Sequence, residues 1–248
     1  MNELDYEKFY DKVGKTNGWD FSQMKCKTEE ETWDFYQDVT KELKKSDVLL
    51  DIGTGGGESL LEIASSAMML IGIDLSHSMV DTAQKNVLNS PYENAAFFQM
   101  NADNIQFPNQ FFNVISCRHS PFSTSEVARV LKENGTFFTQ QVSEHDKYNL
   151  MEKFGRGTIH KKDGELKNRY LNELKEIGFS EVKAYEYNVA EYYETEDDLI
   201  FLLTHTPIIP NFGKDKEDFK LLKQFIEENQ TKKGIVTNSK RFKIVARK

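Results

Sequence analysis

The sequence predicts an α/β fold, with a mostly parallel sheet of seven strands and helices on both faces. Short apolar runs alternate along the chain with amphipathic stretches, which is typical of a parallel sheet covered by helices. The runs are rich in Val, Ile, Leu and Phe and hardly alternate between apolar and polar residues, as expected of strands buried on both faces. At 248 residues, one large domain of this kind can bury its core without disulfide or metal staples.

Seven stretches are the expected strands, and the first five alternate with helices. The strands are Val48–Ile52, Met69–Ile73, Ala95–Met100, Phe111–Cys117, Thr136–Val142, the Tyr- and Val-rich stretch Glu181–Glu194, and Arg241–Lys248. Ser76 is expected to cap a helix that runs through Leu88. Ser123 and Glu126 form a capping-box pattern at the start of the next helix.

Further helices are expected outside this core. Thr28 and Glu31 form a capping box before a helix that includes Trp33 and Leu43. Asp163 is expected to cap a helix after the fifth strand. The expected helices of an insertion before the last strand are Glu196–Thr204 and Glu217–Asn229.

The glycine-rich turn after the first strand predicts a ligand that approaches bare backbone. Asp51, Gly53, Gly55 and Gly57 follow the pattern D-x-G-x-G-x-G. Glycine permits positive φ and leaves no Cβ in the way of a ligand, and the next helix begins with free N–H groups. A dinucleotide site requires G-x-G-x-x-G, but its third glycine would fall on Glu58, whose carboxylate would repel a pyrophosphate. The turn therefore favours a ligand without phosphate.

From about Val48 to Val142, the chain resembles the class I S-adenosylmethionine-dependent methyltransferases. The resemblance implies a Rossmann-like fold and S-adenosylmethionine as cofactor. It also implies that Asp51 accepts the cofactor's ammonium, that Asp74 in "IGIDLS" holds both ribose hydroxyls, and that Asp103 in "NADN" lies beside the adenine amino group. The other residues that it places at the cofactor are Gly53, Thr54, Gly55, Gly57, Leu75, Ala102, Asn104 and Cys117.

The methyl acceptor is left open by the same resemblance. The stretch "FFNVISCRHSPF" occupies the place of the motif beside the transferred methyl, but it contains neither N-P-P-Y nor an obvious proton-abstracting pair. His119 is the candidate catalytic base, and the alternative is a loop histidine bonded to backbone. Arg118 is expected either to bind an acidic substrate group or to pair with a surface carboxylate. Tyr10 and Trp19 are expected at the cofactor and substrate or in the core, and Phe107 at the adenine or in the core.

One methyltransferase domain is expected over residues 1–248. Its parts are an N-terminal helical cap at 1–45, a cofactor-binding core at 46–142, and the C-terminal half of the sheet at 143–248 with an insertion at about 194–231. The insertion and the N-terminal segment are the candidates for a lid that selects the substrate.

Composition and charge favour a cytoplasmic enzyme that acts on a small molecule. Cys26 and Cys117 are far apart and in no metal-ligand spacing, so we expect a reducing compartment and no metal. No stretch reaches the apolar length of a membrane span, so no membrane partner is expected.

Two other functions remain open at this point. A net charge of −8 disfavours a whole-surface nucleic-acid binder, but the seven Lys or Arg and no acid from Thr231 onward keep an RNA methyltransferase as an alternative. A cofactor-binding protein without turnover is the third hypothesis. The sequence leaves the oligomeric state open.

Overall fold

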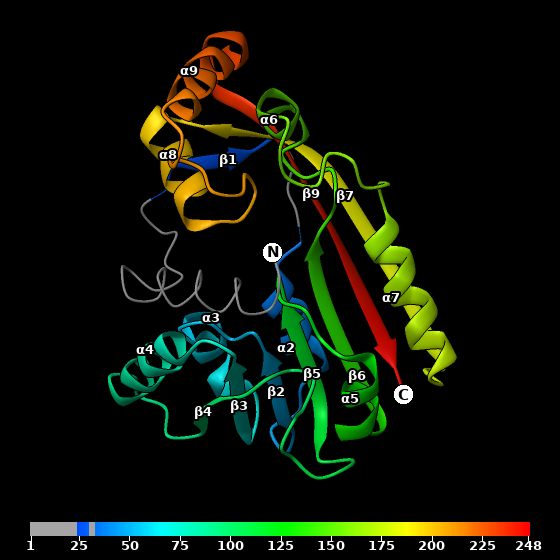
Figure 1. Cartoon of the computed structure of the whole chain (residues 1–248). Coiled ribbons are helices and arrows are strands. Elements are labelled where there is room, and N and C mark those ends of the chain that lie inside the picture. Colours follow the sequence, from blue (N-terminus) through cyan, green and yellow to red (C-terminus); the bar gives the residue numbers. More distant parts are fainter. Residues whose placement is uncertain (1–23, 30–32) are drawn as a thin grey trace.

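The computed structural model describes residues 24–29 and 33–248, which form the α/β architecture that the sequence predicts (Figure 1). Tyr10, Trp19 and Glu31 lie outside the described residues. All seven expected strands are present. The described chain adds two short strands that the sequence did not indicate, β1 (Cys26–Thr28) and β8 (Gln230–Thr231).

The strand order in the sheet is β4, β3, β2, β5, β6, β9, β7, β1, and β8 pairs with β9. The bounds of the longer strands are β2 Val48–Ile52, β3 Met69–Asp74, β4 Ala95–Gln99, β5 Phe112–Arg118, β6 Leu131–Val142, β7 Glu181–Tyr193 and β9 Gly234–Arg247. The strands from β4 to β6 pair in parallel, whereas β9 runs antiparallel to both of its long neighbours. The order reverses at β2, which has β3 on one side and β5 on the other. Ligands of such sheets bind outside the carboxyl ends of the strands at this switch point.

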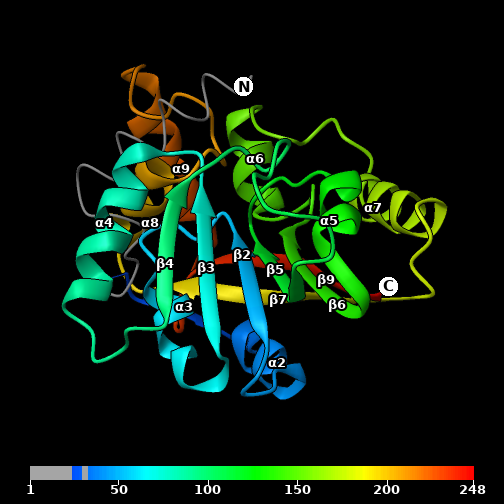
Figure 2. The ribbon, with the colours of Figure 1, turned by 90° about the horizontal axis from the view of Figure 1, so that it is seen from below.

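Helices cover both faces of the sheet. On one face lie α2 (Phe35–Glu42), α3 (Glu58–Glu62), the 3₁₀ turn η1 (Ala64–Ser66) and α4 (His77–Leu88); on the other lie α5 (Thr124–Val130) and α7 (Glu165–Glu176). Figure 2 shows α2 on one side of β2 and β5, and α5 on the opposite side. Leu49 of β2 packs toward α2 and its neighbour Leu50 belongs to the cluster under α5. Both faces are buried, which explains why Val48, Leu49 and Leu50 are all apolar and do not alternate with polar residues.

A second packed unit lies above the carboxyl ends of the parallel strands (Figure 1). Strand β6 ends at Val142 opposite Arg241, while β7 and β9 continue beyond that point. This extension carries β1 and the helices α6 (Tyr148–Phe154), α8 (Glu196–His205) and α9 (Glu217–Asn229). The buried side chains of these elements, among them Leu150, Leu199 and Phe225, form a separate apolar cluster. No helix in the described ranges is long and apolar enough to cross a membrane.

The helix predicted from the capping box at Thr28 begins later than expected. Thr28 is the last residue of β1 and pairs with Glu191 of β7. Asp34 caps α2 instead, and its Oδ1 atom accepts a hydrogen bond of 3.0 Å from Gln37 N. The expected cap at 1–45 therefore includes a strand. Pairing with β7 satisfies the backbone near Thr28, so a second good capping residue starts the helix.

The prediction that Asp163 caps α7 is also wrong. The helix begins after Gly164, and the capping carboxylate belongs to Glu144, which accepts hydrogen bonds from Gly164 N (3.0 Å) and Leu166 N (2.6 Å). Asp163 pairs instead with Lys240 of β9. By contrast, Ser76 and Ser123 cap α4 and α5 as predicted.

The last strand begins at Gly234 and not at Arg241. Its first half pairs with the second half of β7, and the loop after β6 and α6 cover it. The polar residues Thr237, Ser239 and Lys240 are buried there. A strand with buried polar residues has no apolar pattern, so its beginning could not be recognised from the sequence.

Candidate active site

Residues from four strands meet at the switch point of the sheet. Asp51 near the end of β2 lies opposite Gly72 of β3 and opposite Ser116 of β5. Asp74 at the end of β3 lies opposite Gln99 of β4. The structure therefore brings together the strand ends that the sequence assigns to the cofactor.

The glycine turn after β2 is closely packed on two sides. Gly53, Gly55 and Gly57 have φ angles of 71°, 58° and 76°, a region that residues with side chains rarely adopt. A Cβ at Gly53 would lie 2.2 Å from the Cβ atom of Ser120, and one at Gly57 would lie 2.6 Å from the Phe97 ring. The turn therefore fits between the loop after β5 and strand β4 only as bare backbone.

Asp51 is the most deeply buried acid of this edge, with 1% of its surface exposed. Its Oδ1 atom accepts a hydrogen bond of 2.5 Å from Ser116 Oγ, and its Oδ2 atom accepts one of 3.1 Å from the Tyr36 hydroxyl. Burial raises the pKa of Asp51 to about 6, although these hydroxyls and the positive charge of Arg118 oppose the rise. The carboxylate therefore carries a poorly solvated negative charge near neutral pH, which a cation can stabilise.

Thr54, between the first two glycines, presents an unusual hydroxyl. Its Oγ1 atom is buried and has no hydrogen-bond partner of normal geometry among the described residues. It lies near enough to Asp51 to favour the ionised form of that carboxyl. A buried hydroxyl without a partner is uncommon, and a polar ligand in the turn would satisfy it. The turn thus fits a ligand with hydrogen-bonding groups.

Asp74 ties the glycine turn to the end of β3. Its Oδ2 atom accepts a hydrogen bond of 2.9 Å from Gly55 N, and its Oδ1 atom accepts one of 2.9 Å from Ser76 N. Leu75, the next residue, accepts a hydrogen bond of 3.1 Å from the Gln99 side chain through its carbonyl. The position of Asp74 at the turn is compatible with the ribose contact that is predicted for it.

The segment after β4 forms a turn at the same edge. Met100 N donates to the carbonyl of Asp74, and Asp103 N and Asn104 N donate to Asn101. Asp103 and Asn104 are exposed and Ala102 is half-buried. Phe107 lies in an aromatic cluster, with its ring centroid 5.1 Å from that of Phe112 and 5.6 Å from that of Phe111. This packing places Phe107 against the core.

Strand β5 ends beside the glycine turn with Cys117 and Arg118, and His119 follows it. Burial raises the pKa of the Cys117 thiol well above its usual range, so the thiol stays protonated. The Arg118 guanidinium lies over the Tyr36 ring, 5.8 Å from its centroid. His119 has a positive φ of 56° and donates its backbone N–H to the carbonyl of Gln140 at 2.8 Å.

Three residues of this site were not recognised in the sequence. Tyr36 and Ser116 hold the Asp51 carboxylate, and Gln140 contacts His119 through its side chain. Tyr36 could be seen only as a member of the apolar face of its helix. Ser116 and Gln140 did leave a signal, since each is a polar residue inside a strand that is expected to be buried on both faces.

A family model described as a methyltransferase domain matches residues 49–135, from β2 into β6. Residues 49–135 are therefore similar to a methyltransferase domain. A relative in Bacillus subtilis, the uncharacterized methyltransferase YcgJ, is 34% identical over 105 residues, which cover 40% of this chain and 42% of YcgJ. The matches span between 42% and 62% of the length of the first curated relatives.

Several solved structures share the fold of this chain. YcgJ matches with a TM-score of 0.61 and 22% identity, over 86% of this chain and 97% of YcgJ. Haemonchus contortus phosphoethanolamine N-methyltransferase 2, solved with phosphomonomethylethanolamine and S-adenosylhomocysteine, matches with a TM-score of 0.55 and 19% identity, over 86% of this chain and 51% of its own. The [4+2]-cyclase SpnF matches with a TM-score of 0.60 and 17% identity, over 100% and 97% of the two chains.

The raised pKa of Asp51 predicts how the stability of the protein depends on pH. The pKa is 3.8 ordinarily and about 6 in the fold, so burying the protonated acid costs less than burying the carboxylate. The stability that the protonated Asp51 carboxyl contributes is complete below pH 3.8 and is lost as pH rises through 6. The free energy of unfolding of Asp51→Asn, measured by urea denaturation, should therefore rise relative to that of the wild type by up to about 3 kcal/mol between pH 4 and pH 7. Asp103→Asn, at an exposed carboxylate, is the control. A constant difference between Asp51→Asn and the wild type would contradict the prediction.

Proposed function

We propose that the protein transfers a methyl group from S-adenosylmethionine to a small-molecule acceptor. The observation that carries this proposal is the joint arrangement of Asp51, the glycine turn and Asp74. Asp74 binds the backbone of the turn, and the buried carboxylate of Asp51 lies at the neighbouring strand end. Such an edge would hold a nucleoside beside Asp74 and a cation beside Asp51.

Three polar parts of S-adenosylmethionine would find a partner in this arrangement. The ammonium of its amino-acid end would stabilise the desolvated charge of Asp51, and the two oxygens of Asp74 match the two ribose hydroxyls in number. Thr54 Oγ1 supplies a hydroxyl that needs a partner. Asp103, exposed in the turn after β4, would accept a hydrogen bond from the adenine amino group.

Methyl transfer requires little chemistry from the side chains of the protein. Bound S-adenosylmethionine supplies a methyl group that its sulfonium already activates for in-line displacement. The residues of the site have to hold the two reactants in line and exclude water, which can account for about 7–11 kcal/mol of barrier lowering. A covalent intermediate is not needed, and the protonated thiol of Cys117 offers no competing nucleophile.

The charges of the C-terminal strand support a small acceptor over RNA. Most of the basic residues after Thr231 are engaged by acids: Lys233 with Glu29, Lys240 with Asp163 and Glu186, Arg241 with Asp146, Lys243 with Asp38, Arg247 with Glu42 and Lys248 with Glu133. Cations that are already paired attract a polyphosphate backbone weakly. The strip that looks basic in the sequence is therefore close to neutral over the described residues.

The second candidate is a cofactor-binding protein with a different reaction or none. It is favoured by the likeness to SpnF, which extends over nearly the whole length of both chains and which is named a [4+2]-cyclase. A shared fold does not determine the reaction. Only the detection of a methylated product separates this candidate from the proposal.

Binding of the cofactor product gives the first test. S-adenosylhomocysteine is expected to bind in calorimetry with an affinity that falls about tenfold from pH 7 to pH 5, because the ammonium requires the ionised form of Asp51, whose pKa is about 6. Asp74→Ala should weaken binding about 100-fold at every pH, since two charged hydrogen bonds to ribose are lost. Glu176→Ala, at an exposed carboxylate on α7, is the matched control. Unchanged binding in Asp74→Ala, or preferential binding of NAD, would contradict the assignment.

The acceptor class can be tested with cell extract and methyl-labelled S-adenosylmethionine. We expect the label to appear in the small-molecule fraction and not in RNA. Label in RNA, with a binding affinity that falls steeply as salt rises, would favour the RNA methyltransferase instead. Binding of S-adenosylhomocysteine without label in either fraction would favour the second candidate.

A further inference from the structure

The loop that carries His119 is held directly against the glycine turn. The next residue, Ser120, lies so close to Gly53 that a Cβ there would be 2.2 Å from the Ser120 Cβ atom. His119 itself has a φ of 56°, which is uncommon outside glycine and costs conformational energy. Strain of this kind persists only where the surroundings impose the conformation. The packing around this loop therefore holds His119 in its conformation.

Two adjacent glutamines of β6 fix this loop. Gln141 Nε2 donates a hydrogen bond of 2.8 Å to the carbonyl of Ser120. Gln140 accepts the backbone N–H of His119 through its carbonyl, and its side-chain Nε2 atom lies 2.9 Å from His119 Nε2. Successive side chains of a strand point to opposite faces, so the two glutamines reach the loop from different sides.

Trp33 determines which way the Gln140 amide faces. The indole Nε1 atom lies 2.5 Å from Gln140 Oε1. An indole N–H can only donate, so the amide atom that faces it must be the oxygen and the NH₂ group must face His119. Trp33 is held in turn by an edge contact with the Tyr187 ring at 4.6 Å and by Lys243, whose Nζ atom lies 4.7 Å from the indole.

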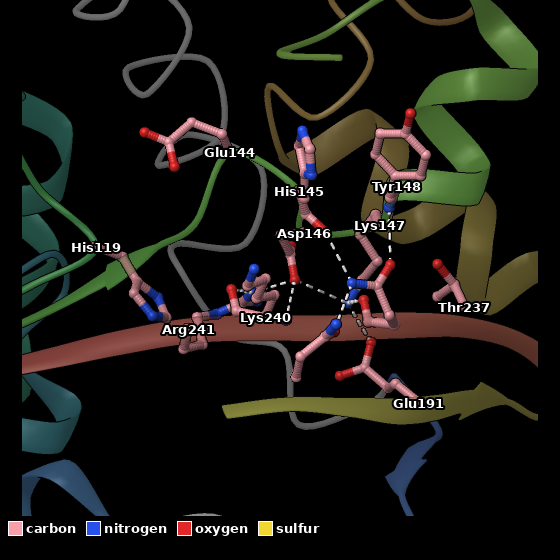
Figure 3. A network of polar contacts seen from close by, with 12 residues as sticks. His119, Glu144, His145, Asp146, Lys147, Tyr148, Glu191, Thr237, Lys240 and Arg241 are labelled. Atoms are coloured by element: carbon pink, nitrogen blue, oxygen red, sulfur yellow. Dashed lines mark hydrogen bonds and ion pairs between the residues drawn. The ribbon is translucent and has the colours of Figure 1, made fainter. Parts of the chain in front are cut away.

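The tautomer of His119 follows from this orientation. Because the Gln140 NH₂ group donates, His119 Nε2 must accept and carries no proton. The proton of the neutral ring is then on Nδ1, for which no partner is found in the described part of the chain. Burial lowers the pKa of His119 well below its usual value, and the positive charges of Arg241 and Arg118 act in the same direction. Figure 3 shows the His119 ring beside Arg241, which Asp146 pairs on its other side.

We propose that Trp33 and Gln140 are positioning residues that hold His119 as a neutral hydrogen-bond donor toward the methyl acceptor. The place of the acceptor rests on the proposed function, whereas the tautomer does not. An Nδ1–H group can bind an oxygen lone pair but cannot take a proton. His119 is therefore a recognition residue for the acceptor and not the general base that the sequence suggested as one of two readings.

This role selects an oxyanion, such as a carboxylate or phenolate, as the acceptor. In the transfer, the bond between sulfur and the methyl carbon breaks and its electron pair stays on sulfur, while an acceptor lone pair forms the new bond to carbon. An oxyanion becomes neutral in this step, so no proton has to be removed. Arg118 favours the same class, because no acid pairs with its guanidinium in the described structure, whereas each of the other arginines there forms an ion pair.

Nitrogen NMR of the histidine-labelled protein tests the tautomer without an acceptor. The His119→Gln spectrum identifies the His119 signals. In the wild type we expect a protonated Nδ1 and an unprotonated Nε2 from pH 5 to pH 8. In Gln140→Glu, a carboxylate oxygen that accepts replaces the NH₂ group that donates, so the proton of His119 should move to Nε2. The imidazolium of this variant should also persist to higher pH than that of the wild type. Trp33→Phe keeps the aromatic ring but frees the amide to turn, and a mixture of tautomers is expected.

A protonated Nε2, or an imidazolium at pH 7 in the wild type, would overturn the proposal. The product of the labelling screen tests the acceptor class, since an O-methyl ester or ether supports it and an N-methylated amine overturns it. If the wild type does not bind S-adenosylhomocysteine, the proposed function is wrong. The spectra still show which ring nitrogen of His119 carries the proton. The two claims can therefore fail separately.

Discussion

The negative charge of Asp51, buried at the point where the sheet reverses its order, is the constraint on which the site depends. A carboxylate removed from water is unfavourable unless donors or a cation stabilise it. Ser116 of β5 and Tyr36 of α2 supply the donors, so one carboxylate links three elements of the fold. The cation is supplied, on the proposal made above, by the ammonium of the cofactor. On that proposal, the same group also favours a zwitterionic nucleoside as the ligand.

The loop after β5 depends on the same edge, because its Ser120 packs against the glycine turn. Gln140 and Gln141 hold the loop from β6, and Trp33 sets the direction of one of the two amides. Polar residues inside strands are costly unless every group has a partner. Here these partners orient a histidine at the place where the acceptor would meet the methyl group. The second packed unit, carried by β7 and β9, lies above the carboxyl ends of the parallel strands (Figure 1).

The parts of the fold that could be predicted are those that local sequence determines. Strand β2 matches its prediction residue for residue, and the glycine turn has positive φ at Gly53, Gly55 and Gly57. The errors come from contacts between distant residues. Glu144 caps α7 from about twenty positions away, and Thr28 is taken into a strand by β7. The site follows the same rule, since Asp51 and Asp74 stand next to recognisable strand ends. The roles of Tyr36, Ser116 and Gln140 depend on contacts between residues that are distant in the sequence.

A crystal structure of the protein with S-adenosylhomocysteine would show whether Asp51 and Asp74 hold the cofactor. We expect the ribose hydroxyls on the two oxygens of Asp74, the ammonium next to the buried carboxylate of Asp51, and the adenine at the turn that contains Asp103. A ligand bound elsewhere, or bound with its ammonium directed away from Asp51, would contradict that expectation.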